Sequence, residues 1–179
     1  MWFLAAAVAV FAALSTLNLI LTLGVVRRLR EQSELIAATG TESVRPMLDI
    51  GQLPAEFATT TVDGETLTRD ALTGATLVAF LSPYCDACEE QVPGFLERAT
   101  AMPGGRDNVL AVVVGRGEEP QAYAQRFRSV ARVVVEPASG PVSSAFEPGG
   151  FPAFGLLGPD GRIAANAVRV DRLDLPVAR

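Results

Sequence analysis

The chain has 179 residues, a net charge of −5 and no histidine, and its two cysteines are Cys85 and Cys88. Two cysteines without histidine cannot supply the four ligands of an ordinary zinc site, or a Cys–His catalytic pair, so the composition excludes both within a single chain. Arginine is the only basic residue and no stretch gathers a basic patch, which argues against nucleic acid as a partner.

The N-terminal segment from Met1 to Val26 contains no charged side chain. As a helix rising about 1.5 Å per residue, it is long enough to cross a hydrocarbon core of roughly 30 Å. A cleaved signal peptide would have a basic start, a shorter apolar stretch and a small-residue cleavage site, and this segment does not fit that pattern. We therefore expect residues 1–26 to be an uncleaved transmembrane helix that anchors a single-pass protein in the cell membrane.

Residues 27–52 are interpreted as stalk and linker, and residues 53–179 as one domain, because that length suffices for one compact core. Arg27, Arg28 and Arg30 directly follow the apolar segment, and the positive-inside rule would place them and the domain in the cytoplasm. A dithiol is more useful on the oxidising side of a membrane, where disulfides form and persist. On this functional ground we expect an extracytoplasmic domain, although the arginines favour the opposite.

The first half of the domain is expected to contain a hairpin and then a strand that leads into a helix. Phe57 to Val62 alternates in polarity, Asp63-Gly64 is typical of a tight turn, and Thr66 to Thr68 returns. The apolar run from Ala75 to Leu81 predicts a buried strand. The helical spacing of apolar residues from Cys85 to about Met102 predicts a helix.

The second half alternates between β-branched runs and short helical segments. We expect strands at Val109–Val114, Arg132–Glu136, Ala153–Leu157 and Arg162–Val168, and helices at Glu118–Arg128 and Pro141–Phe146. Strands joined through helices predict parallel neighbours, and the Asp160-Gly161 turn predicts a final antiparallel hairpin. The fold class is therefore α/β, with a mixed sheet flanked by helices.

The two cysteines stand where the buried strand gives way to the helix. Backbone amides at a helix N-terminus stabilise a thiolate, so Cys85 is the candidate attacking thiol. Cys88, one turn deeper, is the candidate resolving thiol that breaks a mixed disulfide. A purely structural bridge would close so short a loop that it would add little stability. An inert bridge, unreactive thiols or a metal shared between two chains remain alternatives.

Two groups of motifs resemble known proteins. The Cys85-x-x-Cys88 motif, with Pro93 in the helix and Gly150-Phe151-Pro152-Ala153-Phe154 entering the penultimate strand, resembles the thioredoxin fold. The segments Leu53–Phe57 and Leu81–Cys85 resemble the membrane-anchored TlpA-type reductases of the redoxin group, and among them the accessory proteins of methylamine dehydrogenase. The resemblance covers roughly Leu53 to Val168 and implies a thioredoxin-like domain.

The resemblance also implies roles for residues around the dithiol. Pro152 would follow a cis peptide bond and lie against the cysteines, and Phe151 would offer its backbone to an incoming client strand. Tyr84 stands where many relatives have Trp and would also contact the client. The redox-active pair Cys85 and Cys88 would need no further cofactor and no metal.

These observations predict a membrane-tethered thiol–disulfide oxidoreductase, of the protein-disulfide reductase type, which exchanges disulfides with a protein client and is recharged by an upstream reductant. One alternative is a redoxin-type peroxide reductase, although the Pro and Thr pattern upstream of a peroxidatic cysteine is absent. The other is a non-catalytic maturation or binding module that holds a client in the Phe151-Pro152 groove. Asp86-Ala87 between the cysteines and Gln91 beyond them depart from the family pattern and leave the direction of electron flow open.

Overall fold

The computed structural model describes residues 2–3, 15–16 and 45–174. The chain divides into two compact units, Met1–Ser43 and Val44–Arg179. In the first unit the four described residues are helical, and within the described ranges no helix is long and apolar enough to cross a bilayer. The transmembrane helix predicted over residues 1–26 lies outside the described residues, apart from these four.

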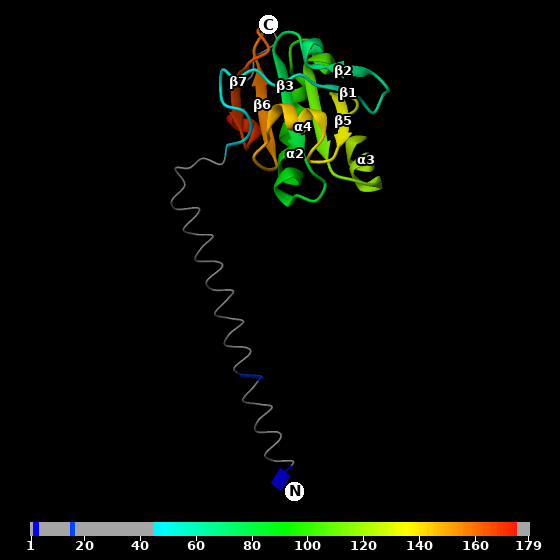
Figure 1. Cartoon of the computed structure of the whole chain (residues 1–179), viewed down its shortest axis with the longest axis vertical. Coiled ribbons are helices and arrows are strands. Elements are labelled where there is room, and N and C mark those ends of the chain that lie inside the picture. The colour runs from blue at the N-terminus through cyan, green and yellow to red at the C-terminus, as the bar shows by residue number, and fades with distance from the viewer. Residues whose placement is uncertain (1, 4–14, 17–44, 175–179) are drawn as a thin grey trace. The chain divides into compact units, whose positions relative to one another are not determined.

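The second unit is built on a five-stranded mixed sheet with the order β5-β4-β3-β6-β7 (Figure 1). The strands are β3 (Thr76–Leu81), β4 (Val109–Val114), β5 (Arg132–Glu136), β6 (Ala153–Leu157) and β7 (Ile163–Ala167). β3, β4 and β5 run parallel, whereas β6 is antiparallel to β3 and to β7. β3 and β4 are buried along their whole length, which explains why they are continuous apolar runs rather than alternating ones.

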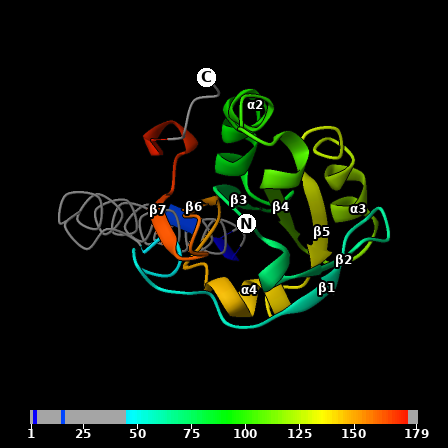
Figure 2. The same cartoon turned by 90° about the horizontal axis from the view of Figure 1, so that it is seen from above.

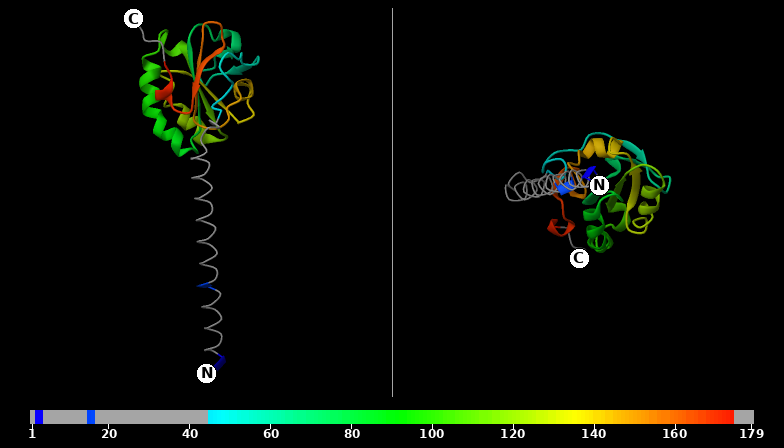
Figure 3. Two further views of the ribbon diagram at one scale, coloured as in Figure 1. Left: turned by 90° about the vertical axis from the view of Figure 1, so that its left-hand side faces the viewer. Right: turned by 90° about the horizontal axis from the view of Figure 1, so that it is seen from below.

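Helices cover both faces of this sheet. The helices α2 (Asp86–Thr100) and α3 (Glu118–Ala124) lie on one face, and α4 (Pro141–Phe146) lies on the other (Figure 2). The hairpin of β1 (Ala58–Thr60) and β2 (Thr66–Thr68) packs beside α4. The left view in Figure 3 shows the helices on the two opposite faces of the sheet. The chain also contains the short 3₁₀ segments η1 (Arg69–Ala71), η2 (Gly105–Asn108) and η3 (Val170–Arg172).

Helix α2 buries one apolar stripe against the sheet. Cys88, Val92, Phe95 and Ala99 recur every three or four residues and are the buried positions of the helix. The Phe95 ring anchors the stripe, because its centroid lies 6.2 Å from that of Phe154 on β6. Cys88 is therefore the first member of a core stripe, and its burial follows from helix periodicity.

The predicted elements are confirmed with small changes of boundary. The strands at 109–114, 132–136 and 153–157 and the helix at 141–146 have the predicted bounds. Helix α3 ends at Ala124 rather than at Arg128, because the following residues form tighter turns in which the Arg126 N–H donates to the Tyr123 carbonyl (3.2 Å). The fold class, an α/β mixed sheet flanked by helices, is as expected from the sequence.

The packed domain begins before Leu53, where the sequence pattern places the end of the linker. Met47 and Leu48 are buried in the core beneath α4, and the Leu48 N–H donates to the Phe146 carbonyl (3.0 Å). The Ile163 N–H donates to the Gln52 carbonyl (2.9 Å), so this segment also pairs with the outer edge of β7. The sequence pattern missed this because the segment has no periodicity and is recruited by burial and edge pairing.

The described chain ends on η3, which docks on α2. Val170 and Leu173 are buried in the core on the α2 side of the sheet. The Gln91 side chain accepts a hydrogen bond from the Val170 N–H (3.2 Å), and Arg98 donates to the Leu173 carbonyl (2.7 Å). Gln91, one of the departures from the family pattern, therefore ties the C-terminal segment to the cysteine-bearing helix.

Candidate active site

The site forms where two strands of opposite direction meet. β6 runs antiparallel to β3, and Ala153 pairs with Phe80 near the carboxyl end of β3. The start of β6 therefore lies beside the end of β3, and Phe151 comes next to Cys85 although 66 residues separate them. The Phe151–Pro152 peptide bond is cis, as the family resemblance implies.

Cys85 is the residue that caps helix α2. Its backbone is extended (φ −126°, ψ 106°), and its carbonyl accepts the first hydrogen bonds of the helix, from Cys88 N–H (2.9 Å) and Glu89 N–H (3.3 Å). Its thiol is half-buried, free, and donates to the Phe151 carbonyl over 3.4 Å. The predicted attacking sulfur thus lies at the positive end of a helix dipole, where a thiolate is stabilised.

Cys88 occupies the opposite kind of environment. It is a free thiol with none of its surface exposed, packed in the core between α2 and the sheet. Burial raises the pKa of Cys88 to about 12, and interactions with Cys85 and the charge of Glu89 add to the effect, while a hydrogen bond with the Ser82 backbone opposes it. The second sulfur is therefore held neutral and away from solvent while the first is accessible.

Of the residues predicted to contact the client, Phe151 touches the Cys85 sulfur through its carbonyl, and Tyr84 directly precedes Cys85 in the chain. Tyr84 has 60% of its surface exposed, and its hydroxyl donates to the Arg116 carbonyl (3.2 Å) across the loop after β4. Gly115 in that loop keeps the space beside the Tyr84 ring open, because a Cβ there would lie 3.2 Å from the ring. Phe151 is half-buried and Pro152 is buried. Their roles in client binding stay predictions.

One buried polar residue of the core cluster that contains Cys88 was not found by sequence reasoning. Tyr123 on α3 is buried in the same core cluster as Cys88, and burial, followed by the charge of Glu89, raises the pKa of its hydroxyl. Arg126 lies 5.1 Å over the Tyr123 ring and pairs with both carboxylate oxygens of Glu89 (2.6 and 2.9 Å). Nothing in the sequence marks Tyr123, because a tyrosine on the apolar side of a helix is an ordinary core residue.

The described ranges hold no group of three or more His, Cys, Asp or Glu side chains arranged to bind a metal ion. The chemistry available at the site is that of the two thiols, the helix N-terminus and the Phe151 carbonyl.

Comparisons with known proteins bear on the fold. No protein-family model matches the chain, and no curated protein matches it. Among solved structures, it is similar to the thioredoxin domain of a thiol-disulfide oxidoreductase from Bacteroides vulgatus, at 22% identity over 69% of this chain and 91% of that chain, with a TM-score of 0.58. It is similar to a thiol:disulfide interchange protein from Bacteroides sp., at 23% identity over 69% and 84% of the two chains, with a TM-score of 0.56.

A secreted disulfide oxidoreductase from Mycobacterium tuberculosis is a third similar structure, at 18% identity over 63% of this chain and 83% of that chain, with a TM-score of 0.52. Similarity at these identities establishes architecture, and the domain of this chain has a thioredoxin-like fold. A shared fold does not determine which reaction a protein carries out, because the reaction depends on the residues of the site.

Proposed function

We propose that the protein is a thiol–disulfide oxidoreductase that acts on protein disulfides through Cys85 and Cys88. The observation that carries the proposal is the asymmetry of the two sulfurs: one caps a helix and touches the Phe151 carbonyl, whereas the other is fully buried with a pKa of about 12. The similar structures from Bacteroides and Mycobacterium tuberculosis are those of disulfide oxidoreductases or interchange proteins, which supports the same chemistry.

The reaction transfers two electrons from the dithiol to the client. The Cys85 thiolate attacks one sulfur of the client disulfide, which forms a Cys85–client disulfide and releases the other client sulfur as a thiolate. That thiolate takes the proton of Cys88. The Cys88 thiolate then attacks the Cys85 sulfur, forms the Cys85–Cys88 disulfide and releases the second client sulfur. The client disulfide is reduced to two thiols and the protein is oxidised.

The environment of each sulfur suits its step. The low exposure and raised pKa of Cys88 keep it from competing for the client, so the order of attack is set by burial. The Cys85 thiol donates to the Phe151 carbonyl in the resting state, and a thiolate can no longer donate. Ionisation of Cys85 therefore frees the Phe151 carbonyl to accept a hydrogen bond from the backbone of an extended client segment, and the exposed Tyr84 offers a second contact to the client.

The proposal includes a membrane tether and a recharging partner. Residues 1–26 would anchor the protein, and the domain would act outside the cytoplasm on a protein client, as in the TlpA-type and methylamine-dehydrogenase accessory proteins that the sequence resembles. An upstream dithiol reductant is needed because each turnover leaves Cys85 and Cys88 oxidised. A membrane-impermeant thiol reagent should label Cys85 in intact cells, and labelling that requires lysis would contradict the extracytoplasmic placement.

The decisive experiment compares two cysteine variants in the reduction of insulin disulfides. Cys85→Ser should lose at least about a hundredfold in rate, because no other described thiol is accessible. Cys88→Ser should still attack but should accumulate mixed disulfides, because the resolving thiol is missing. Mass spectrometry of those adducts from cells would identify the client. Undiminished reduction by Cys85→Ser would refute the proposal.

The same variants test the two alternatives. Consumption of hydrogen peroxide that depends on Cys85 and exceeds the rate with protein disulfides would indicate a peroxide reductase. Client binding and maturation that survive Cys85→Ser would indicate a binding module. Both results would overturn the proposed oxidoreductase function.

A further inference from the structure

The chain enters the domain through residues 45–48, a short segment outside any helix or strand that we call the entry strap. Met47 of the strap has no exposed surface, and a Cβ on Gly155 of β6 would lie 2.5 Å from its sulfur, so Met47 lies directly on β6. The Asn166 side chain on β7 donates from Nδ2 to the Leu48 carbonyl (2.7 Å). The strap is therefore fastened to both antiparallel strands of the sheet.

The strap also contacts the turn that precedes β6. The Gly149 N–H donates to the Pro46 carbonyl (3.1 Å), and a Cβ on Gly149 would collide with the Arg45 carbonyl oxygen. The next residue, Gly150, has open space where its Cβ would be, and neither glycine has a left-handed backbone conformation. Glycine is therefore required at position 149 because the strap backbone approaches so closely, and not because of the local backbone angles.

The turn connects the strap to the reactive sulfur. Two residues after Gly149, the Phe151 carbonyl accepts the hydrogen bond of the Cys85 thiol (3.4 Å). The Phe151 side chain is half-buried and packs against the core cluster that contains Met47. A continuous series of contacts thus runs from the strap through the turn to Cys85.

We propose that the entry strap is a positioning element for protein clients, and that by holding Gly149 it keeps the Phe151 carbonyl where a client backbone N–H can donate to it. This inference rests on the proposed oxidoreductase function and adds a segment that does not itself contact Cys85. A hydrogen bond weakens steeply when its partners are misaligned, so a small shift of the turn lowers client affinity. A small disulfide, which needs only the sulfur, does not depend on this carbonyl.

The test compares Gly149→Ala with its neighbour Gly150→Ala in insulin reduction by the full-length protein, with dithiothreitol as reductant. Gly149→Ala has to displace the strap or the turn, so the KM should rise about three- to tenfold, the effect of losing one hydrogen bond, while kcat stays within about twofold. Gly150→Ala should match wild type within about twofold. Gly150 lies closer to Phe151, so a methyl group that hindered the client directly would act at least as strongly there.

A second variant loosens the strap from its other side. Asn166→Ala removes the hydrogen bond to the Leu48 carbonyl and adds no atom near the turn. It should raise the KM for insulin in the same direction as Gly149→Ala, by about two- to fourfold. In all three variants the reaction of Cys85 with dithiobis(nitrobenzoate), a small disulfide, should keep its wild-type rate within about twofold.

Stability provides the control for a purely structural role. Phe127→Leu shortens a side chain with no exposed surface in the core on the α2 side of the sheet, whereas the strap packs on the α4 side. This variant should lower the urea midpoint and leave the KM for insulin unchanged. If the KM rose in Phe127→Leu as much as in Gly149→Ala, client binding would follow overall stability, and the role of the strap would be overturned.

The outcomes separate this inference from the proposed function. A wild-type KM in Gly149→Ala, an equal rise in Gly150→Ala, or an equal loss of rate with the small disulfide would overturn the positioning role and leave the oxidoreductase function standing. Failure of the wild-type protein to reduce insulin would refute the oxidoreductase function, and this inference with it.

Discussion

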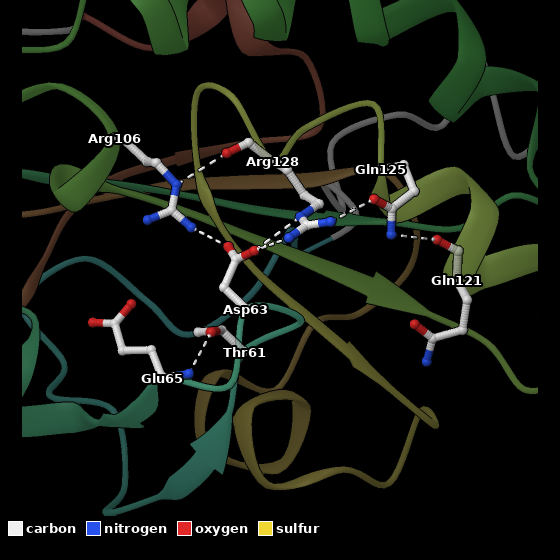
Figure 4. A network of polar contacts seen from close by, with 7 residues as sticks. All are labelled: Thr61, Asp63, Glu65, Arg106, Gln121, Gln125 and Arg128. Atoms are coloured by element: carbon white, nitrogen blue, oxygen red, sulfur yellow. Dashed lines mark hydrogen bonds and ion pairs between the residues drawn. The ribbon is translucent and has the colours of Figure 1, made fainter.

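The two ends of the parallel strands are built on opposite electrostatic plans. At the carboxyl end of β3, Cys88 lies in an apolar environment that keeps it neutral. At the amino ends of β4 and β5, Asp63 in the β1–β2 turn is held ionised between Arg106 and Arg128 (Figure 4). The difference is one of burial: the ion pairs at the Asp63 end are partly exposed and join loops, whereas the Cys88 sulfur is enclosed by core side chains, with the Glu89–Arg126 pair at the surface beside it.

The Asp63 cluster ties three loops together. Arg128 donates from Nε to the Asp63 carboxylate over 2.9 Å, and this hydrogen bonding is the main reason why the pKa of Asp63 is lowered. Arg106 pairs with the same carboxylate and donates to the Arg128 carbonyl (2.9 Å). Because these side chains are partly exposed, the cluster is open to screening by salt, whereas the packing around Cys88 is not.

The largest expected effect on stability comes from removing a large side chain from the apolar core under α2. Phe95→Ala should lower the free energy of unfolding by about 3–5 kcal/mol, because it leaves a cavity between α2 and the sheet. Phe95 has no exposed surface and packs against Phe127 (5.7 Å between centroids) and Phe154. Urea denaturation at low and high salt measures the effect, which should be independent of salt. A loss below about 1 kcal/mol would contradict the assignment of α2 as a core helix.

The next effect is a loss of stability at alkaline pH in the reduced protein. The pKa of Cys88 is raised from 9.0 to about 12 in the folded state, so the unfolded chain releases this proton first. Stability is therefore fully present below about pH 9 and falls as the pH rises toward 12, by up to about 1.4 kcal/mol for each pKa unit. Tyr123, whose pKa is also raised, adds a loss of the same sign.

Urea titrations of the reduced protein across this pH range measure the slope. Cys88→Ala should show a shallower decline, because the thiol that titrates has been removed. Equal slopes for wild type and Cys88→Ala would show that the buried thiol does not set the alkaline limit.

A smaller effect is expected at the rim of the site. Tyr84→Ala should raise the KM for a protein client about three- to tenfold and leave the free energy of unfolding within about 0.5 kcal/mol, because the ring is 60% exposed. Steady-state kinetics with insulin and a parallel urea titration measure the two quantities. Turnover of a small disulfide, which makes no contact with the rim, is the control and should be unchanged.

The smallest effect on stability is expected from removing the charge of Asp63. Asp63→Asn should lower the melting temperature less than Phe95→Ala does, and the difference from wild type should shrink at high salt. Because the pKa of Asp63 is lowered in the folded state, its contribution is present above the ordinary value of 3.8 and is lost as the pH falls through the folded value. Thermal denaturation at neutral and acidic pH follows this loss.

Glu56→Gln is the matched control for Asp63→Asn, because Glu56 contacts a single arginine (3.5 Å from Arg69) and its side chain is 88% exposed. It should leave the melting temperature almost unchanged. Equal effects of the two variants would show that the Asp63 cluster is no more than ordinary surface charge.

Several features were predictable because their cause is local. The runs that became β3 and β4 are almost wholly apolar, and β4 and β5 are rich in valine, a composition that favours buried strands. The Cys85-x-x-Cys88 spacing at the start of a helix placed one sulfur at the cap and the other on the buried stripe. Helix periodicity alone was enough to predict which cysteine is accessible.

Other features were decided only when distant segments met in the tertiary structure. Asp63 pairs with Arg106 and Arg128, which follow it in the sequence by 43 and 65 residues. Met47 is buried because it packs in the core cluster formed by α4 and the sheet. The burial of the Tyr123 hydroxyl also depends on how α3 packs into the core cluster that contains Cys88. The sequence by itself determined the strands, the helix and the order of the two sulfurs, because these follow from backbone geometry and hydrophobic periodicity. Which polar groups surround the buried sulfur was decided by packing between elements, and that packing has no local signature in the chain.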